Sequence, residues 1–139
     1  MGYTFVDHTA DVAADLSGTT PGDLFASAAQ ALTDTITDRT LVRPVQSVEV
    51  ALEAPSLEDL LVDWLNELLY RFEVHNLLVA DADVIVTTDA ACRLAATVHG
   101  ESFDPGRHPS RVLVKSATYH GLRVEERDGQ WRARIVLDI

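Results

Sequence analysis

Apolar residues recur at helical spacing in two segments of the chain, residues 21–36 and 56–73. The second segment begins after Pro55-Ser56, and Asp59 follows Ser56 by three positions, an arrangement like a capping box. The first segment begins at Pro21, a residue that suits the first helical position. Both segments are predicted to be amphipathic helices, and the stripe of the second comprises Leu57, Leu60, Leu61, Trp64, Leu65, Leu68, Leu69 and Phe72.

Much of the remaining chain alternates apolar and polar residues with period two, which is typical of strands with one buried face. Asp128-Gly129 is a strong two-residue turn, and we expect the last three strands to form an antiparallel meander. These elements predict an α+β fold, a two-layer sandwich in which an antiparallel or mixed β-sheet carries both helices on one face. The predicted strands cover residues 11–16, 48–53, 84–86, 92–99, 112–120, 122–126 and 131–139.

Length and charge narrow the class of protein. The 139 residues are predicted to form one domain, residues 1–139, and 47% hydrophobic with 24% charged residues is ordinary globular composition. The 11 Lys and Arg stand against 22 Asp and Glu, which leaves a net charge of −11 at pH 7. This sign repels phosphates and anionic lipids, so we expect neither direct nucleic-acid binding nor a membrane partner.

Several kinds of site are missing from the sequence. Cys92 is the one cysteine, so neither an internal disulfide nor a cysteine-histidine zinc site is expected, and the compartment is predicted to be reducing and cytoplasmic. The first residues lack the pattern of a signal peptide, and no apolar run approaches membrane-spanning length. The chain contains no phosphate loop, dinucleotide fingerprint, nucleophile elbow or HExxH motif, which argues against an autonomous nucleotide-using enzyme.

The end of the sequence offers one candidate site. Alternation places Ile139 on an apolar face with Leu137, so we expect its side chain to be buried and its α-carboxylate to be held in place, whereas most termini fray. Asp138 then points to the opposite face beside that carboxylate. Two such groups offer the hard oxygen ligands that Ca²⁺ or Mg²⁺ prefers. The alternative is that Asp138 pairs with Arg132, Arg134 or another cation, or is simply solvated.

Two further candidates lie near the start and in the predicted loop 100–109. His8 and Asp11 either line a site together or belong to a turn that bonds to local backbone. Glu101, Asp104 and His108 are candidate metal ligands or acid-base groups. If they act in this way, the protein is a small metal-dependent phosphoester hydrolase. The same three residues also suit a polar loop that contacts a partner.

Lys115 is the remaining candidate. Alternation places it in a row with Leu113, Ala117 and Tyr119, so that a charge stands on a largely apolar face. Such a lysine either extends its amine to water, binds a phosphate or pairs with Asp138.

Six sequence segments together resemble one family, archease, nearly from end to end. The opening His8-Thr9-Ala10-Asp11-Val12 and the closing Val136-Leu137-Asp138-Ile139 are the most specific. Residues 60–69, the Gly100-Glu101-x-Phe103-Asp104 segment and residues 114–122 agree as well, and the first helix ends near a family-like Thr37-Asp38.

The resemblance implies a function that the residue patterns alone do not. Archeases are small acidic accessory proteins of the GTP-dependent RNA ligase that joins 2′,3′-cyclic phosphate ends to 5′-hydroxyl ends in tRNA splicing and RNA repair. They promote guanylylation of the ligase's histidine and allow multiple turnovers, without being enzymes themselves. The chain is therefore expected to be a ligase partner, and a general chaperone or scaffold is the other non-enzyme alternative.

The resemblance also implies a ligand set. A divalent cation, most often Ca²⁺ with Mg²⁺ or Mn²⁺ as alternatives, is expected at Asp11, Asp138 and the terminal carboxylate of Ile139. Asp38 is a weaker fourth candidate. The residues expected to contact the ligase are His8, Lys115, Glu101, Asp104 and His108.

Overall fold

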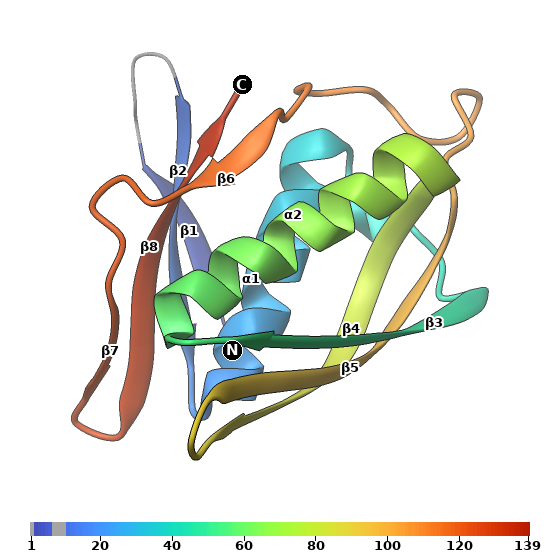
Figure 1. The fold of residues 1–139 in the computed structure, drawn as a ribbon. Coiled ribbons are helices and arrows are strands. Elements are labelled where there is room, and N and C mark those ends of the chain that lie inside the picture. Colours follow the sequence, from blue (N-terminus) through green and yellow to red (C-terminus); the bar gives the residue numbers. More distant parts are fainter. Residues whose placement is uncertain (1, 7–10) are drawn as a thin grey trace.

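The computed structural model describes residues 2–6 and 11–139, which form two α-helices, one short 3₁₀ helix and eight strands (Figure 1). His8, one of the candidate site residues, lies outside this described part. The elements are β1 (Gly2–Val6), β2 (Asp11–Gly18), α1 (Pro21–Ile36), η1 (Arg39–Leu41), β3 (Gln46–Ala54), α2 (Leu57–His75), β4 (Leu77–Thr88), β5 (Cys92–Ser102), β6 (Ser116–Thr118), β7 (Val124–Arg127) and β8 (Gln130–Asp138).

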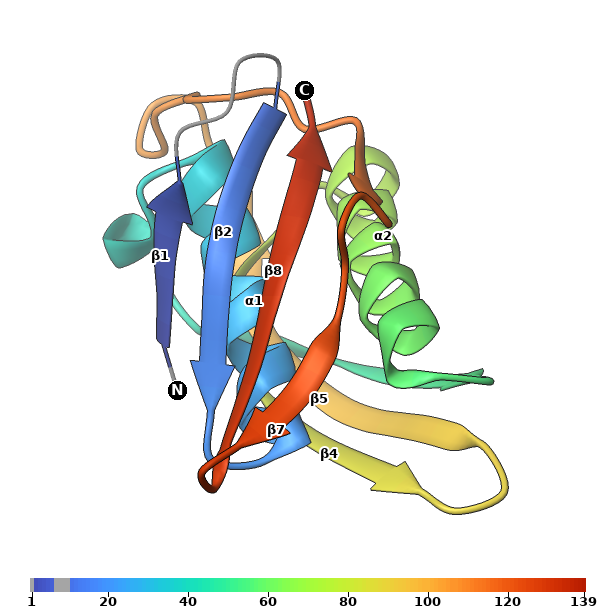
Figure 2. The ribbon, with the colours of Figure 1, turned by 90° about the vertical axis from the view of Figure 1, so that its left-hand side faces the viewer.

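The strands divide into two antiparallel sheets. One has the order β1-β2-β8-β6, with β7 also paired to β8, and the other has the order β3-β5-β4. The helices lie between the sheets: α1 contacts β2 of one sheet and β4 of the other, and α2 contacts β6 and β3 (Figures 1 and 2). The predicted α+β class is confirmed, but the helices cover both sheets instead of one face of a single sheet.

The composition of α1 explains this double packing. Twelve of its 16 residues are buried, so apolar surface surrounds most of the helix instead of forming one stripe. Many of these residues are alanines, whose small side chains let both sheets approach closely. One sheet alone would leave the second buried side of α1 in water.

Both helices begin as the sequence predicts. Thr20 caps α1 by accepting the Asp23 backbone N–H at 3.0 Å, and Ser56 caps α2 by accepting the Asp59 N–H at 3.1 Å. Asp59 does not complete a reciprocal capping box, because its carboxylate accepts the Ser56 hydroxyl at 2.9 Å. In the described part of the chain, no helix combines the length and apolarity that crossing a membrane requires.

The expected three-strand meander is wrong, although the last hairpin is present. Asp128 and Gly129 have φ of 54° and 78°, as a two-residue hairpin turn between β7 and β8 requires. Strands β6 and β7, however, pair in succession along the same edge of β8 and not with each other. Between them the chain turns toward the start of α2, where Tyr119 Oη donates to Asp59 at 2.8 Å and the Val124 N–H donates to Glu58 at 2.8 Å.

Trp64 of α2 joins the two helices. Its side chain is fully buried, and its indole N–H donates a hydrogen bond of 2.9 Å to the backbone oxygen of Phe25 in α1. The ring supplies a large apolar area, and the indole N–H satisfies a buried carbonyl. One side chain thus fixes how the helices lie against each other.

Replacing Trp64 with Phe is expected to lower the free energy of unfolding by about 2 kcal/mol, because a cavity forms and the Phe25 carbonyl loses its donor. Urea denaturation followed by circular dichroism measures this loss. Tyr70→Phe, on the half-exposed face of α2, is the control and should change stability by less than about 0.5 kcal/mol. Equal losses in the two variants would contradict the bridging role of Trp64.

Candidate functional site

The pairing of β2 with β8 places Asp11 directly opposite Asp138. Such cross-strand partners point to the same face of the sheet, with Cβ atoms about 5 Å apart. Two carboxylates in this position repel each other and destabilise the strand pair unless a positive charge offsets them. The α-carboxylate of Ile139 follows one residue later, just beyond the end of β8.

This donor set suits a hard divalent cation. Both aspartates are half-buried, and carboxylate oxygens are the ligands that Ca²⁺ and Mg²⁺ prefer. Over residues 2–6 and 11–139, no three side chains of His, Cys, Asp or Glu lie close enough together to hold a metal ion. To hold a metal ion, the two aspartates therefore need an oxygen donor from outside this set of side chains. The α-carboxylate of Ile139 is a candidate, because it belongs to the backbone.

The expectation that the Ile139 side chain is buried is wrong. It is 38% exposed, whereas Leu137 is 1% exposed. The reason is that β8 ends at Asp138, whose partners Asp11 and Ser116 are the last pairs of their ladders. Ile139 extends beyond the sheet, where no neighbouring strand covers it.

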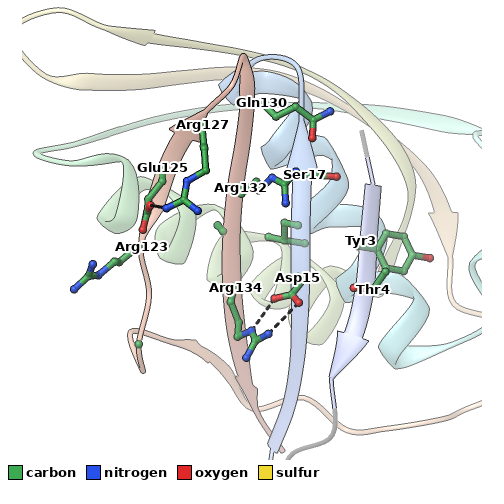
Figure 3. A pocket seen from close by; sticks show the side chains of 13 residues that line it. Tyr3, Thr4, Asp15, Ser17, Arg123, Glu125, Arg127, Gln130, Arg132 and Arg134 are labelled. Atoms are coloured by element: carbon green, nitrogen blue, oxygen red, sulfur yellow. Dashed lines mark hydrogen bonds and ion pairs between the residues drawn. The ribbon is translucent and has the colours of Figure 1, made fainter.

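Arg134, one of the alternative partners of Asp138, forms its ion pair with Asp15 instead. Arg134 Nε donates to Asp15 Oδ1 at 2.7 Å and Nη2 donates to Oδ2 at 3.0 Å, a bidentate pair across β8 and β2 (Figure 3). The hydrogen bond from Arg134 lowers the pKa of Asp15. Asp138 lies four residues further along β8, so Arg134 is engaged elsewhere.

Asp38 caps η1. Its Oδ1 accepts the Thr40 N–H at 3.0 Å and the Thr40 hydroxyl at 2.6 Å, and Oδ2 lies 3.9 Å from Arg111 Nη2. The hydrogen bonds from Thr40 lower the pKa of Asp38. These contacts give the carboxylate a local structural role, and its part as a fourth metal ligand stays a prediction.

Lys115 lies beside the acidic pair, but not in the predicted row. Its backbone N–H donates to the Asp138 backbone oxygen at 2.8 Å, and its side chain is exposed. Strand β6 begins only at Ser116, and Ala117 is buried while Lys115 and Tyr119 are exposed. The regular alternation assumed for residues 112–120 is therefore wrong, because most of this segment lies outside the ladder.

Glu101 is the centre of a buried polar network. Its carboxylate accepts the Arg43 backbone N–H at 2.7 Å and His108 Nε2 at 3.1 Å, and it also pairs with the Arg107 guanidinium. The Asp104 backbone N–H donates to His108 Nδ1 at 2.9 Å, which assigns the ring proton to Nε2. Burial raises the pKa of Glu101, but the hydrogen bonds from Arg43, His108 and Arg107 outweigh burial and lower it overall.

This network holds the loop 100–109 in shape. Glu101 is 9% exposed and His108 1% exposed, and the His108 ring stacks on Phe103 with centroids 5.9 Å apart. A ring this buried presents no surface to a substrate or a partner, so the structure does not support the hydrolase interpretation or direct partner contact by His108. The Glu101 carboxylate is occupied by Arg43, Arg107 and His108, and its contact with a partner stays a prediction. Asp104 is exposed and remains available, although its Oδ1 accepts the Gly106 N–H at 2.9 Å.

Replacing Glu101 with Gln should lower the free energy of unfolding at pH 7 by about 3 kcal/mol, because a buried charge-assisted network is broken. The folded-state pKa of Glu101 lies below its ordinary value of 4.5, so its contribution is present above pH 4.5 and is lost as the pH falls through the folded pKa. The difference between wild type and Glu101→Gln, measured by denaturation from pH 7 to pH 3, should therefore shrink below about pH 4.5. A constant difference would contradict this account.

A groove on the outer face of the five-stranded sheet was not among the sequence predictions. It has a volume of about 750 Å³, and four arginines line it: Arg123, Arg127, Arg132 and Arg134 (Figure 3). The signal was present in the alternation, which places Arg132 and Arg134 on one face of β8. The pattern gave no reason to join them with Arg127 of β7 and with Arg123, just before β7, until the hairpin register was known.

Comparison with known proteins identifies the class. The chain matches the Archease protein family (MTH1598/TM1083) over residues 3–139. It is 39% identical to protein archease of Methanopyrus kandleri over 140 residues, covering 100% of both chains, and 35% identical to that of Pyrococcus furiosus, covering 96% and 95%. The chain belongs to the archease family.

Solved structures agree with this assignment. The solution structure of Methanobacterium thermoautotrophicum protein 1598 superposes with a TM-score of 0.83 at 30% identity, covering 99% of both chains. The crystal structure of a Thermotoga maritima protein, described as an archease and possible chaperone, gives a TM-score of 0.64 at 17% identity over 96% and 94% of the chains. This second likeness concerns the fold alone.

Proposed function

We propose that this archease is an accessory protein of a GTP-dependent RNA ligase, in tRNA splicing and RNA repair. It promotes guanylylation of the ligase's histidine and allows repeated turnover, and it does not catalyse phosphoryl transfer itself. Family membership supports this proposal, as does the absence from the sequence of the common nucleotide-binding motifs. We further propose that the protein works in the cytoplasm, in keeping with its single cysteine.

The observation that carries the proposal is the pairing of Asp11 with Asp138 at the end of the sheet. With the α-carboxylate of Ile139, these residues would hold a divalent cation, most often Ca²⁺, with Mg²⁺ or Mn²⁺ as alternatives. When bound, the ion supplies a compact positive charge at a surface that is otherwise acidic.

The residues around this pair provide a surface for docking. Lys115 adds a cationic side chain next to Asp138, and it can reach carboxylates of the ligase or phosphates of its nucleotide. Leu113 is 74% exposed and Tyr119 54% exposed, so apolar side chains flank the charged group. Docking there activates the ligase only if the archease binds the conformation competent for guanylylation more tightly than the resting one.

Replacing Asp138 or Asp11 with Asn should reduce multiple-turnover ligation by at least about tenfold, because each change removes a charged oxygen donor while it keeps the side-chain size. The measurement uses purified ligase, GTP and RNA, and follows both guanylylated ligase and joined RNA. Asp83→Asn is the matched control, since this carboxylate is 86% exposed and lies on the other sheet.

Full turnover with either site variant would contradict the cation-site form of the proposal. A general chaperone would instead protect unrelated unfolded proteins, with or without Ca²⁺ and equally in all three variants. That result would replace the ligase proposal altogether.

Adding one glycine after Ile139 should weaken Ca²⁺ binding at least about fivefold in calorimetry, because the terminal carboxylate moves by about 3.5 Å. Ile139→Val keeps the position of the carboxylate and should leave the dissociation constant within about twofold. Unchanged affinity in the extended protein would exclude the Ile139 carboxylate as a ligand.

A further inference from the structure

The arginine groove concentrates positive charge on an acidic protein. The chain has 11 Lys and Arg, and four of them line this groove together with the carboxylates of Asp15 and Glu125. The side chains come from β7 and β8, from the segment just before β7 that carries Arg123, and from β2 and β1 (Figure 3). The outer face of the sheet is thus locally positive, although the net charge of the protein is −11.

The two carboxylates neutralise only part of this charge. Arg134 is held by Asp15 in the bidentate pair, and Arg127 Nη2 lies 4.0 Å from Glu125 Oε2. Among the residues that the structure describes, no ion pair is formed by Arg123 or Arg132, and both side chains are exposed. The Arg132 guanidinium lies over the sheet near Ser17, with Glu125 as its partner in the ladder, whereas the Arg123 side chain extends outward, away from β8 (Figure 3).

The acidic end of the sheet does not cancel these charges. Along β8, Asp138 lies four residues from Arg134 and six from Arg132, or about 14 and 20 Å at the rise of a strand. Both separations exceed the screening length of about 8 Å at physiological salt. The five-stranded sheet therefore has a negative end at Asp138. The groove lining has four arginines against two carboxylates, although Glu126 and Asp128 of the same hairpin add negative charge nearby.

We propose that this groove binds the phosphate backbone of a single-stranded nucleic acid. Guanidinium groups match phosphate oxygens with paired donors, and all four cations of the groove are arginines. Arg132 and Arg134 stand about 7 Å apart on one strand. Arg132 forms no ion pair among the described residues, and Arg134 contacts a second phosphate only if its bidentate pair with Asp15 opens. Thr4, Ser17 and Gln130 also line the groove and supply neutral donors of the kind that bind phosphate oxygens.

An extended strand of phosphates fits this face better than an acidic protein surface does. A phosphodiester backbone presents charges in a continuous row, and each phosphate offers the paired oxygens that a guanidinium matches. Contacts through phosphates carry no base preference. The inference modifies the expectation from net charge, because screening lets a local group of arginines act at physiological salt.

The proposal concerns the isolated protein, so it stands or fails independently of the ligase. A short oligouridylate is titrated into ¹⁵N-labelled protein at physiological salt, and amide shifts are followed by NMR. The expected dissociation constant is on the order of 10⁻⁴ M, in the range of non-specific binding, with shifts concentrated in β2, β7 and β8.

The double variant Arg123→Gln/Arg132→Gln should weaken binding at least about tenfold. The slope of log affinity against log salt should become less steep by about 1.4, because two phosphate contacts are lost. The matched control is Arg71→Gln/Arg93→Gln, which removes the same charge from α2 and from β5. The control should bind within about twofold of wild type, and the spectra themselves report whether each variant is folded.

Three results would overturn the proposal. The first is an absence of shifts in β7 and β8 of the wild-type protein at millimolar oligouridylate. The second is a control variant that loses as much affinity as the groove variant. The third is tighter binding of poly-glutamate than of oligouridylate with the same loss in the groove variant, which would assign the groove to an acidic protein partner.

Discussion

The antiparallel pairing of β2 with β8 is the constraint on which the other features depend. It joins strands from opposite ends of the sequence, from Asp11↔Asp138 at one end to Gly18↔Trp131 at the other. Its register places the two aspartates opposite each other and sets Asp15 against Arg134. A shift of one residue would turn every side chain of one strand to the other face, and would place Ala14 and Leu16 in water. The burial of those two residues in the core therefore protects the polar arrangement on the outer face.

Helix α1 is the second constraint, because it lies between the two sheets. A Cβ atom on Gly22 would lie 2.3 Å from the backbone oxygen of Val84, so only glycine permits this approach of the helix start to β4. Glycine costs up to about 1 kcal/mol in a helix, and the close packing of the second sheet offsets that cost. The three-stranded sheet is thus fixed to the same helix that supports β2.

The sequence predicted the positions of helices and strands better than it predicted which strands pair with each other. Helical periodicity located both helices to within two residues, since an apolar stripe is a local property of the chain. Alternation identified strands but not which strands pair, so the single sheet, the meander and the burial of Ile139 were expected wrongly. Residue patterns alone did not bring Asp11 to Asp138, because the β2–β8 register joins residues far apart in the chain.

The polar loop shows a different limit. Glu101 and His108 have the composition of a catalytic or binding site, and only their burial and their hydrogen bonds to Arg43 and Asp104 show a structural role. Side-chain types in a sequence do not distinguish a polar group that supports a loop from one that faces a ligand. The arginine groove is the converse case, because its four residues are unremarkable in sequence and are gathered only by a hairpin.

The shared edge of β8 has a consequence for motion. Because β6 and β7 pair with different parts of this edge, residues 119–123 separate them, and hydrogen bonds from Tyr119 and Val124 anchor this connection to the first turn of α2. The two short strands therefore form separate ladders with β8, each with its own hydrogen bonds. Strand β6 borders the carboxylate end and β7 borders the arginines, so the fold insulates these two regions from each other along this edge. Occupation of one region does not have to loosen the other.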